Sequence, residues 1–107
     1  MTNLDLHQNA HEYRFAHDEL FRFRVNARSA RLFGLWVGKI LGLAGDGLED
    51  YASRIMSASV THAHAADILD HLASELARRE IMITKAQLIA HQDTLREQAK
   101  AELTAHV

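Results

Sequence analysis

Two groups of histidines have spacings that could hold a metal ion. His64, Asp67 and His71 lie at i, i+3 and i+7, so one helix face would present all three, and His7 and His11 form a pair at i and i+4. Zinc binds imidazole and carboxylate ligands in such arrangements. Neither group contains the glutamate that acts as the base of a helical HExxH site. We therefore interpret these histidines as solvated side chains on polar helix faces and predict no metal site.

Three arginines have a spacing suited to anion binding. Arg24, Arg28 and Arg31 lie at i, i+4 and i+7, so three guanidinium groups can share one helix face, and guanidinium matches phosphate geometry well. The alternative is pairing within the protein, because residues 22–43 carry a net charge of +5 and residues 44–80 a net charge of −4. We favour ion pairs with acidic second and third helices, and keep nucleotide or anion binding as the second interpretation.

Patterns typical of catalysis are missing from the chain. The serines do not stand in a GxSxG turn, and the glycines match neither GxGxxG nor a phosphate-binding Walker A loop. Asp18 and Glu19 are adjacent carboxylates, but neighbouring residues of a helix point about 100° apart and do not share a site. We predict that the protein is not an enzyme and needs no cofactor.

Composition narrows the class of protein further. The chain has 107 residues, a net charge of −2, 48% hydrophobic residues and no cysteine, which indicates one ordinary globular domain without disulfides. The small negative charge argues against a general nucleic-acid binder. No apolar run approaches the roughly 20 residues that cross a bilayer, and no signal peptide is visible. We expect a cytoplasmic protein without direct membrane insertion.

The longest continuous helical pattern runs from Tyr13 to Leu43 and holds six of the seven aromatic residues. A helix of that length spans about 45 Å, which is longer than a small domain is wide, so it either breaks or projects. Small residues recur at every fourth position of it, at Ala30, Gly34, Gly38 and Gly42. This ridge predicts close packing by a neighbouring helix, because glycine inside a helix otherwise costs about 1 kcal/mol. The glycines at 45 and 47 predict its end.

The apolar stripe of residues 1–19 is thinner than a core-facing helix normally shows. We predict that this segment is helical in tendency but frayed or disordered when the protein is alone. From residue 20 the stripe strengthens and is expected to include Leu20, Phe23 and Ala27. Residues 1–19 are therefore treated as a partner-binding segment, and residues 20–107 as the folded domain.

Three further helices follow. The second carries one apolar face between Leu48 and Val60, and the third is expected to begin after a cap at Ser59 or Thr61. The fourth begins at the capping box Thr84-Lys-Ala-Gln87, in which threonine and glutamine side chains bond each other's backbone amides. We expect it to bury Leu88, Ile89, Leu95, Ala99 and Leu103. No segment alternates like a strand, so the fold class is all-α, an antiparallel four-helix bundle with a long first helix and a frayed or projecting N-terminal segment.

Two consecutive motifs resemble a known family. FAHDE at residues 15–19 is followed by FRVNARSARLFGLW at residues 23–36, and together they resemble the zeta-type ATPase inhibitor subunits of alphaproteobacterial F1Fo-ATP synthases. The likeness covers about residues 9–60. Residues 57–64 depart from it, because family members carry an acidic stretch where this chain reads SASVTHAH.

The resemblance implies a regulatory inhibitor of ATP hydrolysis, located at the membrane only through F1. Its N-terminal segment would enter a catalytic α/β interface of F1 and block rotation of the central stalk, while the free protein is expected to be a monomer. Carried over by position, the matching residues are Tyr13, Arg14, Phe15, Ala16, His17, Asp18 and Glu19. The family also implies weak binding of ATP or ADP, without a motif that assigns residues. The alternative is a stand-alone helical module that binds a nucleotide or another protein.

Overall fold

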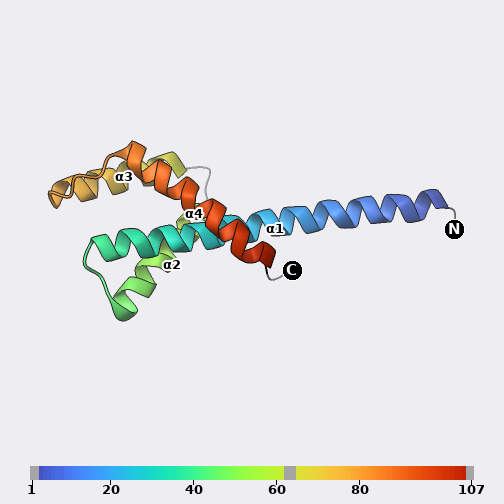
Figure 1. Ribbon diagram of the computed structural model, residues 1–107, viewed down its shortest axis with the longest axis horizontal. Coiled ribbons are helices and arrows are strands. Elements are labelled where there is room, and N and C mark those ends of the chain that lie inside the picture. The colour runs from blue at the N-terminus through green and yellow to red at the C-terminus, as the bar shows by residue number, and fades with distance from the viewer. Residues whose placement is uncertain (1–2, 62–64, 106–107) are drawn as a thin grey trace.

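The computed structural model describes the backbone of residues 3–61 and 65–105, and the side chains of residues 17–59 and 68–105. The described chain contains helices and no strand (Figure 1). The helices are α1 (Asn3–Ile40), α2 (Gly45–Thr61), α3 (Ala65–Arg78) and α4 (Lys85–Ala105). The predicted all-α four-helix fold with a long first helix is confirmed.

Helix α1 determines the shape of the molecule. It has 38 residues, which corresponds to about 57 Å at 1.5 Å per residue, and the whole chain measures 66 × 26 × 20 Å. Its C-terminal half lies within the bundle, whereas its N-terminal half extends away from the other three helices (Figure 1). The long helix therefore projects instead of breaking. The predicted helical tendency of residues 1–19 is confirmed for the part from Asn3 onward.

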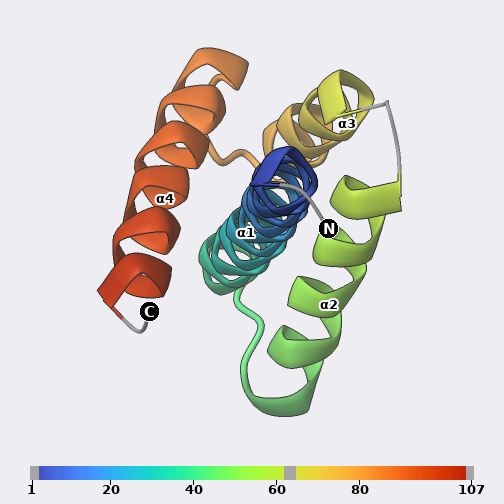
Figure 2. The ribbon, with the colours of Figure 1, turned by 90° about the vertical axis from the view of Figure 1, so that its right-hand side faces the viewer.

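Helices α2 and α4 pack on different sides of α1, with α3 bridging above (Figure 2). The contact with α2 is close because two glycines of the predicted ridge lie in it. A Cβ atom on Gly34 would be 2.8 Å from the Cα of Ala52, and one on Gly38 would be 2.6 Å from Leu48 Cδ1. Ala52 is fully buried. Close packing thus compensates for the low helix propensity of both glycines.

The end of α1 differs from the prediction. The helix ends at Ile40, and Gly42 adopts a φ of 86°. The amide of Leu43 donates to the carbonyl of Gly38 at 2.9 Å, which is the hydrogen bond of a Schellman cap. A Cβ at Gly42 would have no neighbour within 4 Å, so Gly42 serves the turn and does not extend the packing ridge. Gly45, which we expected to end α1, is instead the first residue of α2.

Helix α3 ends with the same type of cap but without glycine. Glu80 has a φ of 62°, and the amide of Ile81 donates to the carbonyl of Leu76 at 2.9 Å. A residue with a side chain is strained in this left-handed conformation. The start of α3 also differs from the prediction, because α2 continues to Thr61 and includes Ser59. Helix α3 begins at Ala65, and residues 62–64 before it lie outside the described part of the chain.

Helix α4 begins as predicted. The amide of Gln87 donates to Thr84 Oγ1 at 3.1 Å, and the amide of Thr84 donates to Gln87 Oε1 at 2.9 Å, so the capping box is confirmed. Farther along, the ring of His91 stacks on Trp36 of α1 with centroids 3.8 Å apart. This stack and the buried Leu95 and Ala99 hold α4 against α1.

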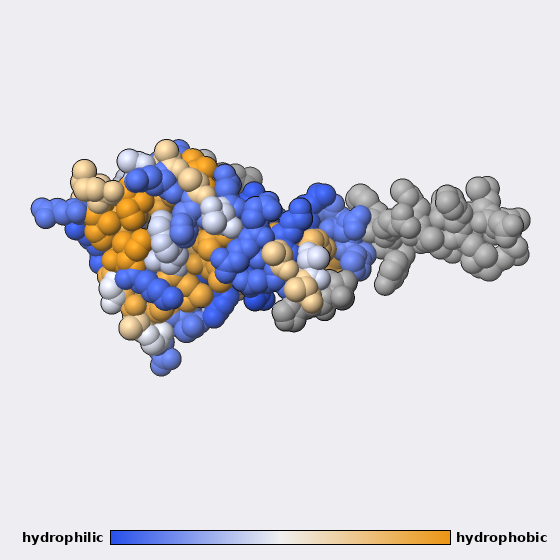
Figure 3. Space-filling model, viewed as in Figure 1, coloured by the Kyte–Doolittle hydropathy of each residue, from blue (hydrophilic) through white to orange (hydrophobic). Residues whose placement is uncertain are grey.

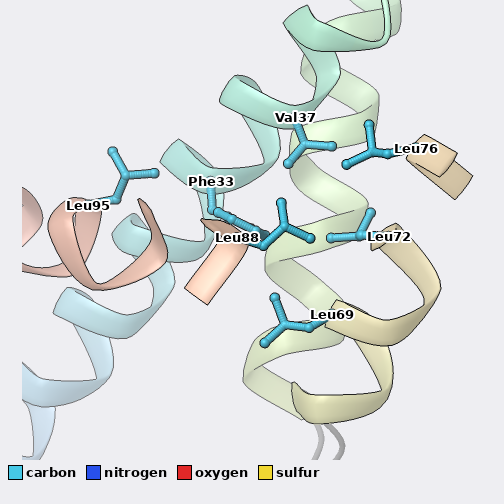
Figure 4. Close-up of a cluster of buried hydrophobic side chains, with 7 residues drawn as sticks. All are labelled: Phe33, Val37, Leu69, Leu72, Leu76, Leu88 and Leu95. Carbon is cyan, nitrogen blue, oxygen red and sulfur yellow. The ribbon is translucent and has the colours of Figure 1, made fainter. Parts of the chain in front are cut away.

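The core lies where α1, α3 and α4 meet, as the cluster of side chains in Figure 4 shows. Its buried members come from all three helices. They are Phe33, Val37, Leu69, Leu72, Leu76, Leu88 and Leu95. Burying a side chain of this size contributes about 1.5–3 kcal/mol, so the cluster is a major source of stability.

Three residues that we expected to face the core are exposed. Leu20 is 47% exposed, Phe23 56% and Ile89 39%. Leu20 and Phe23 lie on the glycine side of α1, and α2 is too short to reach them from its contact with Gly34. The bundle instead buries Val25 and Ser29, on the side of α1 that faces α4. We assigned the apolar residues of α1 to a single core-facing side, whereas two sides of α1 pack against neighbouring helices.

Replacing Gly34 with alanine tests the close approach of α1 and α2. The new methyl group would meet the Ala52 backbone, so we expect a loss of about 1–3 kcal/mol in the free energy of unfolding. Gly47→Ala is the matched control, because its Cβ has no neighbour within 4 Å, and better helix propensity should stabilise it by up to about 1 kcal/mol. Urea denaturation measures both, and equal stability of the two variants would contradict the packing.

Replacing Glu80 with glycine tests the strained cap of α3. Glycine adopts a positive φ without steric cost, so Glu80→Gly is expected to raise the free energy of unfolding by about 1 kcal/mol. The same substitution at the exposed Glu97 inside α4 is the control and should lower stability by about 1 kcal/mol. Thermal unfolding distinguishes the two, and destabilisation by both would contradict the assigned conformation of Glu80.

Candidate functional site

The predicted partner-binding residues lie on α1 where it leaves the bundle. His17, Asp18 and Glu19 are exposed. Tyr13, Arg14, Phe15 and Ala16 belong to the same helix, and their side chains lie outside the described set. All seven residues therefore belong to one helical segment, and its last three are accessible to a partner.

Helix α4 ends beside this segment. Its C-terminal turn contributes Thr104 to a small hollow of about 220 Å³ that His17, Asp18 and Phe21 also line. Since α4 ends at Ala105, the part of α1 before His17 extends past the end of its nearest helical neighbour. The surface at this junction is mostly hydrophilic, whereas apolar surface gathers over the opposite end of the bundle (Figure 3).

Next to the hollow, α1 and α4 form a charged groove of about 350 Å³. We call it the α1–α4 groove. Its basic side chains outnumber its acidic ones, and Arg22 already pairs with Glu19 at 3.3 Å. The lining residues are Asp18, Phe21, Arg22, Val25, Asn26, Arg96, Glu97 and Lys100. Charged side chains thus surround the base of the projecting segment on two helices.

The three arginines proposed for anion binding have different surroundings. Arg28 Nε donates to Glu102 Oε2 of α4 at 2.7 Å, and Arg31 Nη2 lies 2.6 Å from Glu49 Oε2 of α2. Arg24 is exposed and forms no ion pair with any described residue. Two of the three charges are therefore engaged in ion pairs on different sides of α1.

The expected pairing of basic α1 with acidic α2 and α3 is only partly correct. Arg31 pairs with α2, as expected, but Arg28 pairs with α4. The ion pair of α3 that spans helices is Asp70 with Lys85 of α4, at 2.7 Å. The reason is geometric: the Cα atoms of α3 do not come within 8 Å of those of α1 among the described residues, so Asp70 pairs with α4 instead.

The histidine groups considered for metal binding lie almost entirely outside the described side chains. His64 lies outside the described residues, as do the side chains of His7, His11 and Asp67. His71 is exposed, and its Nε2 lies 3.9 Å from Glu75 Oε2. Within the searched part of the chain, no three potential ligands converge.

Sequence reasoning missed a further cavity, which lies between the turn after α1, helix α2 and helix α3. We call it the α2–α3 cleft, and its volume is about 390 Å³. Its apolar lining consists of Leu41, Leu43, Ile55 and Leu72. Its polar lining consists of Tyr51, Arg54, His71, Glu75 and Arg79. A signal was present, because His71, Glu75 and Arg79 recur at every fourth position and share one face of α3.

Tyr51 is the most perturbed polar group of the α2–α3 cleft. Its hydroxyl is buried and has no hydrogen-bond partner among the described residues. Burial, together with the smaller effect of the Glu75 charge, raises the pKa of Tyr51 from 10.0 to about 12, while the charges of Arg54 and Arg79 oppose this change. The phenol is therefore neutral at physiological pH.

The projecting helix and the bundle define a class of small helical proteins whose most accessible element is a protruding helical segment. No described helix contains an apolar stretch that could span a membrane. The chain belongs to the family of ATPase inhibitor subunit zeta, whose sequence model matches residues 1–102. No match is found among curated proteins or among solved structures.

Family membership confirms the resemblance seen in the two sequence motifs and extends it to most of the chain. It supports a general role as an inhibitor of F1-ATPase and a regulatory protein that associates with that enzyme.

Tyr51→Phe tests the unpaired hydroxyl. The substitution removes no hydrogen bond, so the free energy of unfolding at neutral pH should be unchanged or raised by about 1 kcal/mol. Because the folded pKa exceeds the unfolded one, the neutral phenol stabilises the fold fully below pH 10, and this contribution is lost as pH rises to about 12. Denaturation at several pH values should show a steeper alkaline loss for the wild type than for Tyr51→Phe. Parallel curves would contradict the raised pKa.

Proposed function

We propose that the protein inhibits ATP hydrolysis by inserting residues 1–19 at a catalytic α/β interface of F1, which blocks rotation of the central stalk. Residues 20–107 stay outside as a folded body that holds the inserted segment. The family match supports inhibition in general. The observation that carries the specific mechanism is the extension of α1 beyond the other helices (Figure 1).

A continuous helix is suited to blocking a rotary motor. The inserted part must resist force, and α1 joins it to the bundle without a linker. We call the inserted segment, residues 1–19, the arm. No proline occurs in the chain, and the first glycine of α1 is Gly34, so the common causes of helix kinks are missing between the arm and the bundle. Force applied to the arm is therefore transmitted to the packed part of α1, where α2 and α4 hold it.

The bundle also lowers the cost of forming the arm. Starting a helix is unfavourable, with a nucleation constant of about 0.001, whereas extending an existing helix is nearly neutral. Because α1 is already helical within the bundle, residues before His17 only extend it. The ordering of a disordered segment on binding typically costs about 2–5 kcal/mol of free energy. A helix that is already nucleated reduces that cost.

A variant that begins at Leu20 tests the role of the arm. We expect the full chain to inhibit ATP hydrolysis by the F1 of its own cell, and the variant to inhibit at least tenfold less, with the bundle helices retained by circular dichroism. Equal inhibition by the two proteins would contradict insertion of residues 1–19.

The double substitution of Glu19 and Leu20 by glycine tests whether the arm needs a rigid helical connection to the bundle. Both side chains are exposed, so the bundle should remain folded while the helix between arm and bundle weakens by about 2 kcal/mol. Inhibition is expected to weaken although every other residue of the arm is present. Unchanged inhibition would show that the arm acts without a rigid connection to the bundle.

A further inference from the structure

The α2–α3 cleft lies on the bundle, away from the arm and from the α1–α4 groove. Its volume of about 390 Å³ falls within the range of about 300–1,000 Å³ that is usual for small-molecule sites. Leu41 and Leu43 bring the turn after α1 into its wall, while α2 and α3 provide the remaining lining. Three separate segments of the chain thus converge on one concave surface.

The charges of the cleft leave one cation without a partner. Glu75 lies 3.7 Å from Arg79 Nη2 and 3.9 Å from His71 Nε2, so its carboxylate is shared between these neighbours on α3. Arg54 of α2 forms no ion pair with any described residue, including Asp50 one turn earlier. The arginines of the cleft, Arg54 and Arg79, outnumber its single carboxylate, Glu75, by one positive charge.

The other walls of the cleft are suited to an apolar group. Leucine and isoleucine side chains from the turn, α2 and α3 form the lining beside Arg54. The Tyr51 ring adds to it, and because its hydroxyl is buried, the polar contact is left to Arg54. Guanidinium binds a carboxylate through two parallel hydrogen bonds.

We propose that the α2–α3 cleft binds a small molecule with one carboxylate on an apolar body, with Arg54 holding the carboxylate. The single excess charge matches a monoanion. A phosphate monoester, with nearly two charges at neutral pH, would require a second free cation, and Arg79 is engaged by Glu75. The site is independent of the arm and of its action on F1.

Titration of the full-length protein with octanoate tests the proposal. We expect saturable binding at one site by calorimetry. The amide resonances that shift should belong to residues 41–43, 51–55 and 71–79. Octan-1-ol, which has the same chain without the carboxylate, should bind at least tenfold more weakly. Shifts that do not saturate, or that centre on another surface of the bundle, would overturn the proposal.

Two matched variants test whether Arg54 is the residue that binds the carboxylate. Arg54→Gln should weaken octanoate binding at least tenfold, whereas Arg78→Gln removes another exposed charge that lies outside the cleft and should leave binding unchanged. Both side chains are exposed, so both variants should fold, which their thermal unfolding checks. Equal affinity of Arg54→Gln and wild type would overturn the role of Arg54.

Binding of octyl phosphate more tightly than octanoate would overturn the assignment to a monoanion.

Discussion

The contact of α1 with α2 at Gly34 is the constraint on which the arrangement of the bundle depends. Without a side chain there, the Ala52 backbone lies where a Cβ atom would otherwise be. This close approach leaves the other side of α1 available for α4, where Val25 is buried and lies beside Arg96 and Lys100. Helix α1 can therefore be packed from two sides at once, and a helix held in that way can extend beyond the bundle as a stiff element.

The same arrangement explains why the α2–α3 cleft exists. With α2 and α4 on α1, α3 is held by these two neighbours and by core side chains such as Leu72 and Leu76 (Figure 4). Its backbone does not approach α1 within 8 Å among the described residues. Side chains therefore fill only part of the space between α2, α3 and the turn after α1. The polar face of α3 that carries Glu75 borders the space that remains, which is the α2–α3 cleft.

The two functional surfaces of the molecule thus follow from one packing scheme but have different physical characters. The arm is a helix that extends beyond the end of α4, so its energetics are those of extending a helix onto a partner surface. The cleft is preformed, so its energetics depend on desolvation and on one guanidinium group. Ion pairs between helices, Arg28 with Glu102 and Arg31 with Glu49, fix the bundle between these surfaces, although each is partly exposed and contributes modestly.

Local chemistry in the sequence was enough to determine much of the fold and of the candidate site. The capping box at Thr84, the packing of Gly34 and Gly38, the four helices and the excess length of α1 all depend on residues near one another in the chain. The two motifs between residues 15 and 36 were likewise enough to indicate the family, because their combination is specific.

The tertiary structure alone decided which neighbour covers each helix face. Arg28 pairs with a residue 74 positions away, and Leu20 and Phe23 are exposed because α2 ends before reaching them. The left-handed conformation of Glu80 carries no sequence signal, since glycine is the residue that normally marks it. The α2–α3 cleft is likewise a product of helix placement. Periodicity fixes which side chains share a face, but long-range packing fixes what that face meets.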